Sequence, residues 1–268
     1  MTTIVNRLRQ AYYGGVVSFK HLYYGNSGEP IRYGKHDLRY VPGTRPVRLK
    51  YVNSPNGTVR NDAKQISFFL EQLKPGDFVL DIGGNVGQYA VLFASLVSVA
   101  GQIISFEPDR SARVVLEKNL SLNGLSDRVV VEPLALFDVA GTRLLFSNSQ
   151  ADATAALVRP AGDKHAVLEQ PVKTERLDDY LASRNLRCPD WIKLDTEGAE
   201  INILRGARET LKSGAKVACE LHPYAWSDFG TSFRELLEIV SECGRTIRYL
   251  DESLNIKDGA FYGAALIL

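Results

Sequence analysis

A short apolar run that ends in a carboxylate and a cluster of glycines constrains the fold of this chain most. Residues 78–96 read FVLDIGGNVGQYAVLFASL, so the β-prone run Phe78–Leu80 is followed by Asp81, a glycine-rich turn and an apolar stretch long enough for a helix. Glycines let a backbone turn sharply and approach a ligand, and the first N–H groups of a helix favour electron-rich ligands. The order predicts a strand, a ligand-binding turn and a helix, with these turn residues as ligand-binding candidates: Gly83, Gly84, Asn85 and Gly87.

A second acid follows the next predicted strand. The run Gln102–Phe106 is followed by Glu107, the position at which nucleotide-binding α/β folds hydrogen-bond the hydroxyl groups of a ribose. A dinucleotide fingerprint would need glycines at i, i+2 and i+5, but Asn85 stands two residues after Gly83. The pattern D-x-G-x-N-x-G is instead the form found in S-adenosylmethionine (SAM) methyltransferases. Asp81 and Glu107 are therefore the acidic candidates for binding a cofactor.

Strand and helix patterns alternate from Lys74 onward, which predicts an α/β fold with a mostly parallel sheet and helices on both faces. Two closing strands without an intervening helix predict an antiparallel strand at one edge of the sheet. A polar, Ala-rich insertion is expected between two further short strands. Strands are expected at 78–81, 102–106, 129–132, 142–146, 170–173, 191–195, 216–221, 246–250 and 260–268, and helices from 86, at 111–122, 176–183 and 200–212, and from 232 to 244.

Two later motifs place more acids and a histidine at strand ends. WIKLDTEGAE puts Asp195 after an apolar strand, where a buried carboxylate needs a partner. Glu197 and Glu200 follow it, and helix capping is the simpler interpretation of Glu200. In CELHP, Glu220 and His222 are two residues apart on an extended segment, so their side chains project to the same side.

The composition is that of an ordinary globular protein, with 45% hydrophobic and 24% charged residues. Its most apolar window, 89–100, is too short to span a bilayer, and the first residues lack the apolar segment of a signal peptide. The three cysteines are scattered without C-x-x-C spacing, which favours a reducing compartment. We therefore expect a cytoplasmic protein without transmembrane segments.

Residues 1–60 differ in composition from the rest of the chain. They contain ten Lys and Arg against two Asp and Glu, a net charge of +8, and seven of the twelve tyrosines. Basic residues interleaved with tyrosine suit an anionic or sugar-bearing substrate, and suit equally well an interface with the acidic remainder or with a second copy. We expect residues 1–60 to form a substrate lid or an interface, and residues 61–268 to form the SAM-dependent methyltransferase domain.

The motifs DIGGNVGQY, FEP, TERLDDY, IKLDTEGAE with LRGA, and ELHP occur in this order in the FkbM family of SAM-dependent methyltransferases, which the chain resembles over roughly residues 70–225. The resemblance implies a Rossmann-like class I methyltransferase fold with a seven-stranded sheet, and methylation of hydroxyl groups on sugars, glycolipids or secondary metabolites. It also implies that Asp81, Gly83 and Gly87 line the methionine and ribose end of SAM. Where many class I enzymes place an acid for the adenine, this chain has the run 133–135, Pro-Leu-Ala, which leaves the adenine contact open.

In-line attack of an acceptor hydroxyl on the SAM methyl group is the expected reaction. His222 is the expected base, because an ordinary histidine is neutral near pH 7, and Asp195 would orient it or act as the base. A divalent metal (Mg²⁺ or Mn²⁺) on Asp195, Glu220 and His222 is a less favoured alternative. An aminopropyltransferase that uses decarboxylated SAM, and a non-catalytic binding or scaffold protein, remain as other classes. The expected partner is a small-molecule or glycan acceptor rather than nucleic acid, with a homodimer also considered.

Overall fold

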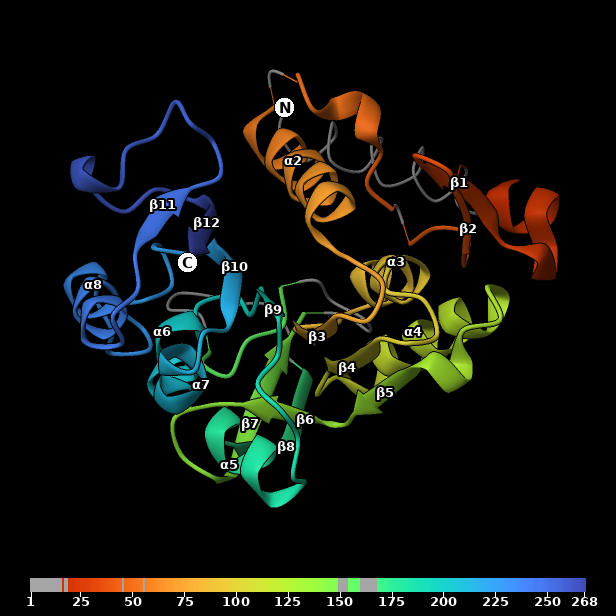
Figure 1. The fold of residues 1–268 in the computed structure, drawn as a ribbon. Helices are drawn as coiled ribbons and strands as arrows, with labels where there is room; N and C mark the ends of the chain where they lie inside the picture. Colours follow the sequence, from red (N-terminus) through yellow and green to blue (C-terminus); the bar gives the residue numbers. More distant parts are fainter. Residues whose placement is uncertain (1–15, 17–18, 45, 55, 149–153, 160–167) are drawn as a thin grey trace, which may run out of the picture.

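The computed structural model describes residues 16, 19–44, 46–54, 56–148, 154–159 and 168–268. In this part of the chain, seven strands form the central sheet in the order β11-β12-β10-β9-β3-β4-β5 (Figure 1). All are parallel except β12, which pairs antiparallel with both β10 and β11 and so lies one strand in from the edge. The expected mostly parallel sheet is confirmed. The strands are β3 (Phe78–Ile82), β4 (Gln102–Phe106), β5 (Val129–Glu132), β9 (Trp191–Leu194), β10 (Lys216–Leu221), β11 (Ile247–Tyr249) and β12 (Gly263–Ile267).

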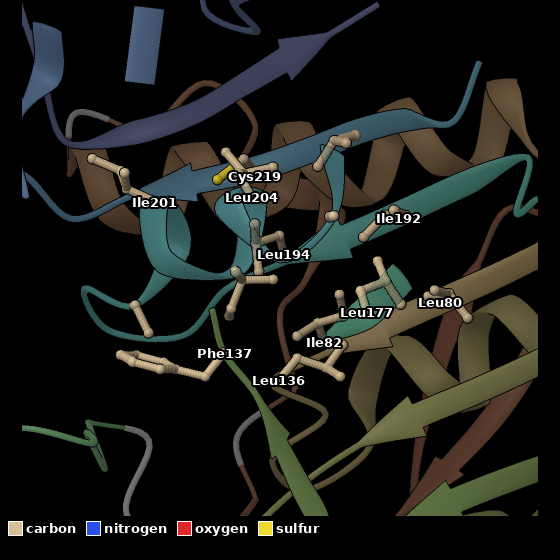
Figure 2. Packing of buried hydrophobic residues seen from close by; sticks show 14 of the residues in the cluster. Leu80, Ile82, Leu136, Phe137, Leu177, Ile192, Leu194, Ile201, Leu204 and Cys219 are labelled. Atoms are coloured by element: carbon tan, nitrogen blue, oxygen red, sulfur yellow. The ribbon is translucent and has the colours of Figure 1, made fainter. Parts of the chain in front are cut away.

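Two apolar clusters cover the two faces of this sheet. Side chains alternate along a strand, so Phe78, Leu80 and Ile82 belong to one cluster and Val79 belongs to the other. Figure 2 shows the first cluster, in which Leu80, Ile82 and Leu194 approach residues of the helices on that face. The first cluster includes side chains of α5 (Leu177–Ser183), α6 (Glu200–Arg205), α7 (Arg208–Lys212) and α8 (Phe233–Glu242). The second includes side chains of α2 (Gly57–Gln72), α3 (Gln88–Leu96) and α4 (Arg110–Leu122).

The helix expected over residues 200–212 is interrupted, and forms α6 and α7 instead. The chain bends at Gly206, where an added Cβ would lie 2.5 Å from the carbonyl oxygen of Phe137. This close approach leaves room for glycine alone at the junction between the two short helices. The helix expected from residue 232 begins with a side-chain cap, because the Ser232 hydroxyl accepts a hydrogen bond from the backbone N–H of Glu235.

A second, three-stranded sheet in the order β6-β8-β7 adjoins the first. β7 (Gly141–Ser147) and β8 (Leu168–Glu175) are the two short strands expected around the insertion, and β6 (Leu134–Leu136) was not expected. Residues 149–153 and 160–167 of the insertion lie outside the described residues. Four 3₁₀ turns complete the described structure: η1 (Gly25–Ser27), η2 (Leu49–Tyr51), η3 (Ser126–Arg128) and η4 (Ile256–Asp258).

The N-terminal segment contributes to the main core. β1 (Glu29–Tyr33) and β2 (His36–Tyr40) form an antiparallel hairpin, and Tyr33 and Tyr40 are both fully buried. The Tyr40 hydroxyl donates to the carbonyl oxygen of Gln88 on α3 (3.2 Å), and Asn119 on α4 accepts from the N–H of Val41. Helix α2 continues through residue 60, across the expected domain boundary. Tyr12 and Tyr13, also counted among the tyrosines of this segment, lie outside the described residues.

Within the described residues, no helix is both long and apolar enough to cross a membrane. The three cysteines are free, and Cys219 is buried in the core on β10 (Figure 2).

Candidate active site

A cavity of about 370 Å³ opens at the carboxyl ends of β3, β4, β9 and β10, the edge at which parallel sheets bind ligands. The cavity walls also include residues of β6, α2 and the N-terminal segment. Of the predicted site residues, the structure brings six to the cavity wall: Gly83, Gly84, Asn85, Glu107, Asp195 and Glu220. Asp81, Gly87 and His222 are not among the described residues that line it.

The glycine-rich turn is held by close contacts with the protein itself. A Cβ on Gly83 would lie 1.8 Å from the carbonyl oxygen of Asp195, and one on Gly84 would lie 2.1 Å from the Ser105 hydroxyl oxygen. Gly87 forms the N-cap of α3 in the left-handed region. Asn85 also has a positive φ of 44°, a conformation that asparagine tolerates better than most residues. The pattern G-G-N-x-G is therefore a packing requirement that shapes one wall of the cavity.

Asp81 lies beneath this turn and is fully buried. One carboxylate oxygen accepts a hydrogen bond from the Ser105 hydroxyl (3.0 Å), and the other has no hydrogen-bond partner among the described residues. Burial raises the pKa of Asp81, against the opposing effect of the nearby Lys193 ammonium. In this position Asp81 supports the turn from below, and its predicted contact with SAM stays a prediction.

Glu107 occupies the cavity wall at the end of β4. Its two carboxylate oxygens accept hydrogen bonds from the backbone N–H groups of Asn85 and Asp109, both at 2.7 Å. Burial raises its pKa to about 7, although these hydrogen bonds act in the opposite direction. A carboxylate has about four lone-pair sites, so Glu107 retains capacity for ligand hydroxyls.

Asp195 directly follows β9 and is paired with a buried lysine of that strand, two residues earlier. The Lys193 ammonium lies 3.0 Å from the Asp195 carboxylate and 4.6 Å from the centre of the Tyr89 ring. Burial would raise the pKa of Asp195, but Lys193 and His222 together hold it below its usual value. Asp195 lines the cavity, so it presents an ionised carboxylate to any ligand there.

His222 is a buried cation rather than a neutral base. Its Nδ1 lies 3.0 Å from Glu200, and its Nε2 lies 3.8 Å from Asp195 and 3.6 Å from Glu197. Burial would lower the pKa of His222, but the hydrogen bond to Glu200 and the charges of the three carboxylates raise it to about 10. The expectation that His222 is neutral near pH 7 is therefore wrong, and an imidazolium has no free lone pair to accept a proton.

Glu200 holds this histidine in place. It is fully buried, and besides His222 it accepts hydrogen bonds from the Trp226 indole N–H (2.9 Å) and the Gly198 backbone N–H (2.8 Å). The Gly198 contact agrees with the expected capping of the helix start. The two side-chain contacts add a function that the capping interpretation left out.

Glu197 is the site residue that sequence reasoning undervalued. It lines the cavity, and its φ of 52° places it in the left-handed region, an uncommon conformation for glutamate. Strained backbone of this kind is concentrated at functional sites. The Tyr224 hydroxyl donates to its carboxylate (2.9 Å), and burial raises the pKa of Glu197. The sequence signal available for this residue was the glycine that follows it, Gly198, because glycine often follows a residue in a tight turn.

Glu220 is not part of the group of described residues whose spacing would suit a metal ion. Its oxygens accept hydrogen bonds from the Tyr262 hydroxyl (2.5 Å) and the Gln65 amide (3.1 Å). Among the described residues, the His, Cys, Asp and Glu side chains with metal-ligand spacing are Asp195, Glu197 and His222, whose ligand atoms all lie within 4.8 Å of one another. Glu197 thus replaces Glu220 in the expected set.

Asp62, on α2, contributes a further carboxylate to the cavity wall. Burial, together with the charges of Glu220 and Asp195, raises its pKa to about 7, while Lys193 acts in the opposite direction. Nothing in the local sequence around Asp62 indicates a site, because only the packing of α2 against the sheet brings it there.

Comparison with known protein families gives the family of this chain. The model of the methyltransferase FkbM domain matches residues 81–247, more than half of the chain. The chain belongs to the FkbM methyltransferase family. The matched range of this family member begins at Asp81 and includes Glu107, Asp195, Glu197 and His222.

Three curated relatives are similar to this FkbM family member. The 2-O-methyltransferase NoeI of Sinorhizobium fredii is 33% identical over 165 residues, which cover 55% of this chain and 63% of NoeI. The 31-O-demethyl-FK506 methyltransferase FkbM of Streptomyces tacrolimicus is 29% identical, over 52% of this chain and 62% of that protein. The hexuronic acid methyltransferase AglP of Haloferax volcanii is 25% identical, over 69% and 70%. The match thus spans less than two thirds of the length of NoeI and FkbM.

Proposed function

We propose that this protein is a SAM-dependent O-methyltransferase that acts on a hydroxyl of a sugar, glycolipid or secondary metabolite. The main observation is that one cavity is lined both by Glu107, at the end of β4, and by Asp195 and Glu197, after the end of β9. Membership of the FkbM family and the names of its O-methyltransferase relatives support the reaction type.

The cavity has the chemistry that SAM requires. Glu107 would accept hydrogen bonds from the ribose hydroxyls, because its oxygens keep lone pairs beyond the two backbone contacts. The apolar residues of β6, with Leu145 and Leu157, would pack against the adenine, in place of the missing acid after β5. Asp195 would face the positively charged sulfur, since its carboxylate stays ionised.

When bound, SAM supplies a methyl group on a sulfonium that is already reactive, so the protein contributes alignment, exclusion of water and proton removal. We assign proton removal from the acceptor hydroxyl to Glu197. Its pKa is raised, so it holds a proton better than Asp195 does, and it lines the same cavity. The His222 imidazolium lies behind both carboxylates and keeps their mutual repulsion small.

A metal-assisted version of the reaction is the second candidate, supported by the spacing of Asp195, Glu197 and His222. A metal ion there would lower the pKa of the acceptor hydroxyl. Coordination by the His222 Nε2 would require loss of its proton, which the surrounding carboxylates retain up to a pKa of about 10. Activity that disappears with EDTA and returns only with Mg²⁺ or Mn²⁺ would select this version.

We also propose that residues 1–60 take part in recognising a small-molecule or glycan acceptor. Thr44 and Val47 line the cavity, which supports a role as a wall of the site. The same segment buries Tyr33 and Tyr40 in the core, so it is an integral part of the fold as well.

The test combines an acceptor screen with a matched pair of variants. The purified protein is incubated with SAM and a panel of neutral methyl glycosides, hexuronic acid glycosides and macrocyclic alcohols, and S-adenosylhomocysteine (SAH) is measured by mass spectrometry. With the best acceptor, Glu197→Gln should lower the rate roughly 100- to 10,000-fold while SAH affinity stays unchanged. The control is Glu238→Gln, a change at an exposed acid of α8 that pairs with Arg234.

Three outcomes would contradict the proposal. Binding of SAM without SAH formation for any acceptor would favour the non-catalytic binding protein. Consumption of decarboxylated SAM with a polyamine would favour the aminopropyltransferase. A Glu197→Gln variant with the wild-type rate would remove this residue from proton transfer.

A further inference from the structure

Two neighbouring tyrosine rings lead from the cavity wall to the protein surface. Tyr262 lines the cavity, and Tyr224, whose ring centre lies 6.4 Å from that of Tyr262, is 66% exposed. The two ring planes differ by 39°, and the ring centres lie 5.7 Å (Tyr224) and 5.6 Å (Tyr262) from that of His222. An exposed aromatic ring beside a cavity offers a flat apolar surface on which a ligand can pack.

Carboxylates hold the hydroxyl ends of both rings. The Tyr224 hydroxyl donates to Glu197 (2.9 Å), and the Tyr262 hydroxyl donates to Glu220 (2.5 Å). Both glutamates line the cavity, and a carboxylate has about four lone-pair sites, so each can also accept from a hydroxyl of a ligand. Apolar ring surface and hydrogen-bond acceptors therefore lie next to each other at this end of the cavity.

The cavity offers little positive charge to an acceptor. Among the described residues that line it, the cation is Lys193, whose ammonium is already paired with Asp195. The nearby His222 imidazolium is buried and shared among three carboxylates. The lining residues described in the N-terminal segment, Thr44 and Val47, are uncharged. The carboxylates that line the cavity are those of Asp62, Glu107, Asp195, Glu197 and Glu220.

We infer that the methyl acceptor is a neutral pyranose whose ring packs on Tyr224 while its hydroxyl groups donate to Glu197 and Glu220. The inference rests on the proposed O-methyl transfer and narrows its acceptor to one chemical class. A pyranose has C–H groups that suit the electron-rich face of an aromatic ring, and hydroxyls around its rim that suit the carboxylates. A macrocyclic alcohol would bring few hydroxyls to these carboxylates, and a hexuronic acid would bring a like charge.

Binding of sugars to the SAH-loaded protein tests the inference without turnover. The probes are the neutral methyl glycosides of glucose, galactose, mannose, rhamnose and xylose, together with methyl glucuronide, and binding is measured by saturation-transfer NMR and titration. At least one neutral glycoside should bind. Methyl glucuronide should bind at least about tenfold more weakly than that glycoside, because like charges in one site repel each other.

Two substitutions at Tyr224 separate the function of the ring from that of the hydroxyl. Tyr224→Leu removes the aromatic face and should weaken binding of the best neutral glycoside by about tenfold, whereas Tyr224→Phe keeps the ring and should change it by less than about twofold. In turnover of the same glycoside, Tyr224→Leu should raise KM. Tyr224→Phe should instead lower kcat, because Glu197 loses its donor. Val114→Ala, at an exposed apolar residue of α4, is the control.

Circular dichroism and an unchanged affinity for SAH establish that each variant is folded. The inference is overturned if no neutral glycoside binds, if the one that binds is not methylated, or if methyl glucuronide binds equally well. Unchanged glycoside binding by Tyr224→Leu also overturns it. Wild-type protein that does not bind SAH contradicts the proposed function itself, so the two failures are distinguished.

Discussion

The buried imidazolium of His222 gives the protein a pH-dependent stability that one substitution removes. Its pKa is about 10 in the folded protein against an ordinary 6.5, which corresponds to about 5 kcal/mol of stabilisation at about 1.36 kcal/mol per pKa unit. Because folding raises this pKa, the stabilisation is fully present below pH 6.5. It is lost as the pH rises from there through 10.

A window between about pH 7.5 and 9 isolates this contribution. Burial raises the pKa of Asp62 and Glu107 to about 7, so these groups change their protonation mainly at lower pH. In the folded protein, the three cysteine thiols, whose pKa burial raises above 9, and Lys193, whose pKa is above 10.5, titrate at higher pH. The thiols of the unfolded chain begin to ionise near the top of the window, equally in the wild type and in a His222 variant, so the difference between the two slopes reports His222. Within the window, the free energy of unfolding of the wild type should fall by about 2 kcal/mol.

Urea unfolding at several pH values measures this fall, and His222→Gln should remove most of it. The variant should also be less stable at pH 7, by about 3 kcal/mol, because the buried Glu200 loses its charged partner. His36→Gln is the control, since burial lowers the pKa of His36 and its imidazole is neutral throughout the window. Nitrogen chemical shifts of the His222 ring would report the titration directly in the wild type. A ring that titrates near pH 6.5, or a variant with the wild-type slope, would refute the reasoning.

Three further predictions concern the cofactor, the turn and the N-terminal segment. Glu107→Gln should weaken SAH binding by roughly 1–3 kcal/mol in calorimetry, and wild-type affinity should rise between pH 6 and 8 as this carboxyl, with a pKa of about 7, ionises. Gly83→Ala should cost at least about 3 kcal/mol in urea unfolding, because its Cβ would lie 1.8 Å from the Asp195 carbonyl oxygen, whereas Gly214→Ala, with open space around it, should cost about 1 kcal/mol. Deleting residues 1–50 should give a protein without a cooperative melting transition, since Tyr33 and Tyr40 are fully buried; a stable truncated protein would show that the hairpin is dispensable.

The parts of the fold that local sequence determines were predictable. The strand, turn and helix around Gly83 appear as a continuous pattern, and the carboxyl ends of parallel strands necessarily share one edge. The sequence alone therefore suffices to assign Glu107 and Asp195 to one cavity. The break near Gly206 was less accessible, because this glycine packs against the backbone of Phe137, about 70 residues earlier.

The chemical state of the site depended on contacts that the sequence does not display. A histidine after a strand predicts a base only if its neighbours leave it neutral, and three carboxylates from the segment after β9 surround His222. Glu200 is a case of one residue with two functions, since capping explained its position but not its contact with the histidine. Asp62 lies more than 100 residues from Asp195 in the sequence, so only the packing of α2 brings them to the same cavity.

The register of the central sheet explains why the charged groups of the site are concentrated on one face. Ser105, Asp81 and Lys193 are aligned across β4, β3 and β9, and alternation turns all three side chains toward the α2 and α3 side. A buried row of this kind is stable only if its members satisfy one another, and Lys193 serves both Asp81 and Asp195. Losing this lysine would leave the buried Asp81 without its cation and Asp195 with His222 alone, so the residue that balances the charge inside the sheet also helps to keep Asp195 ionised at the cavity.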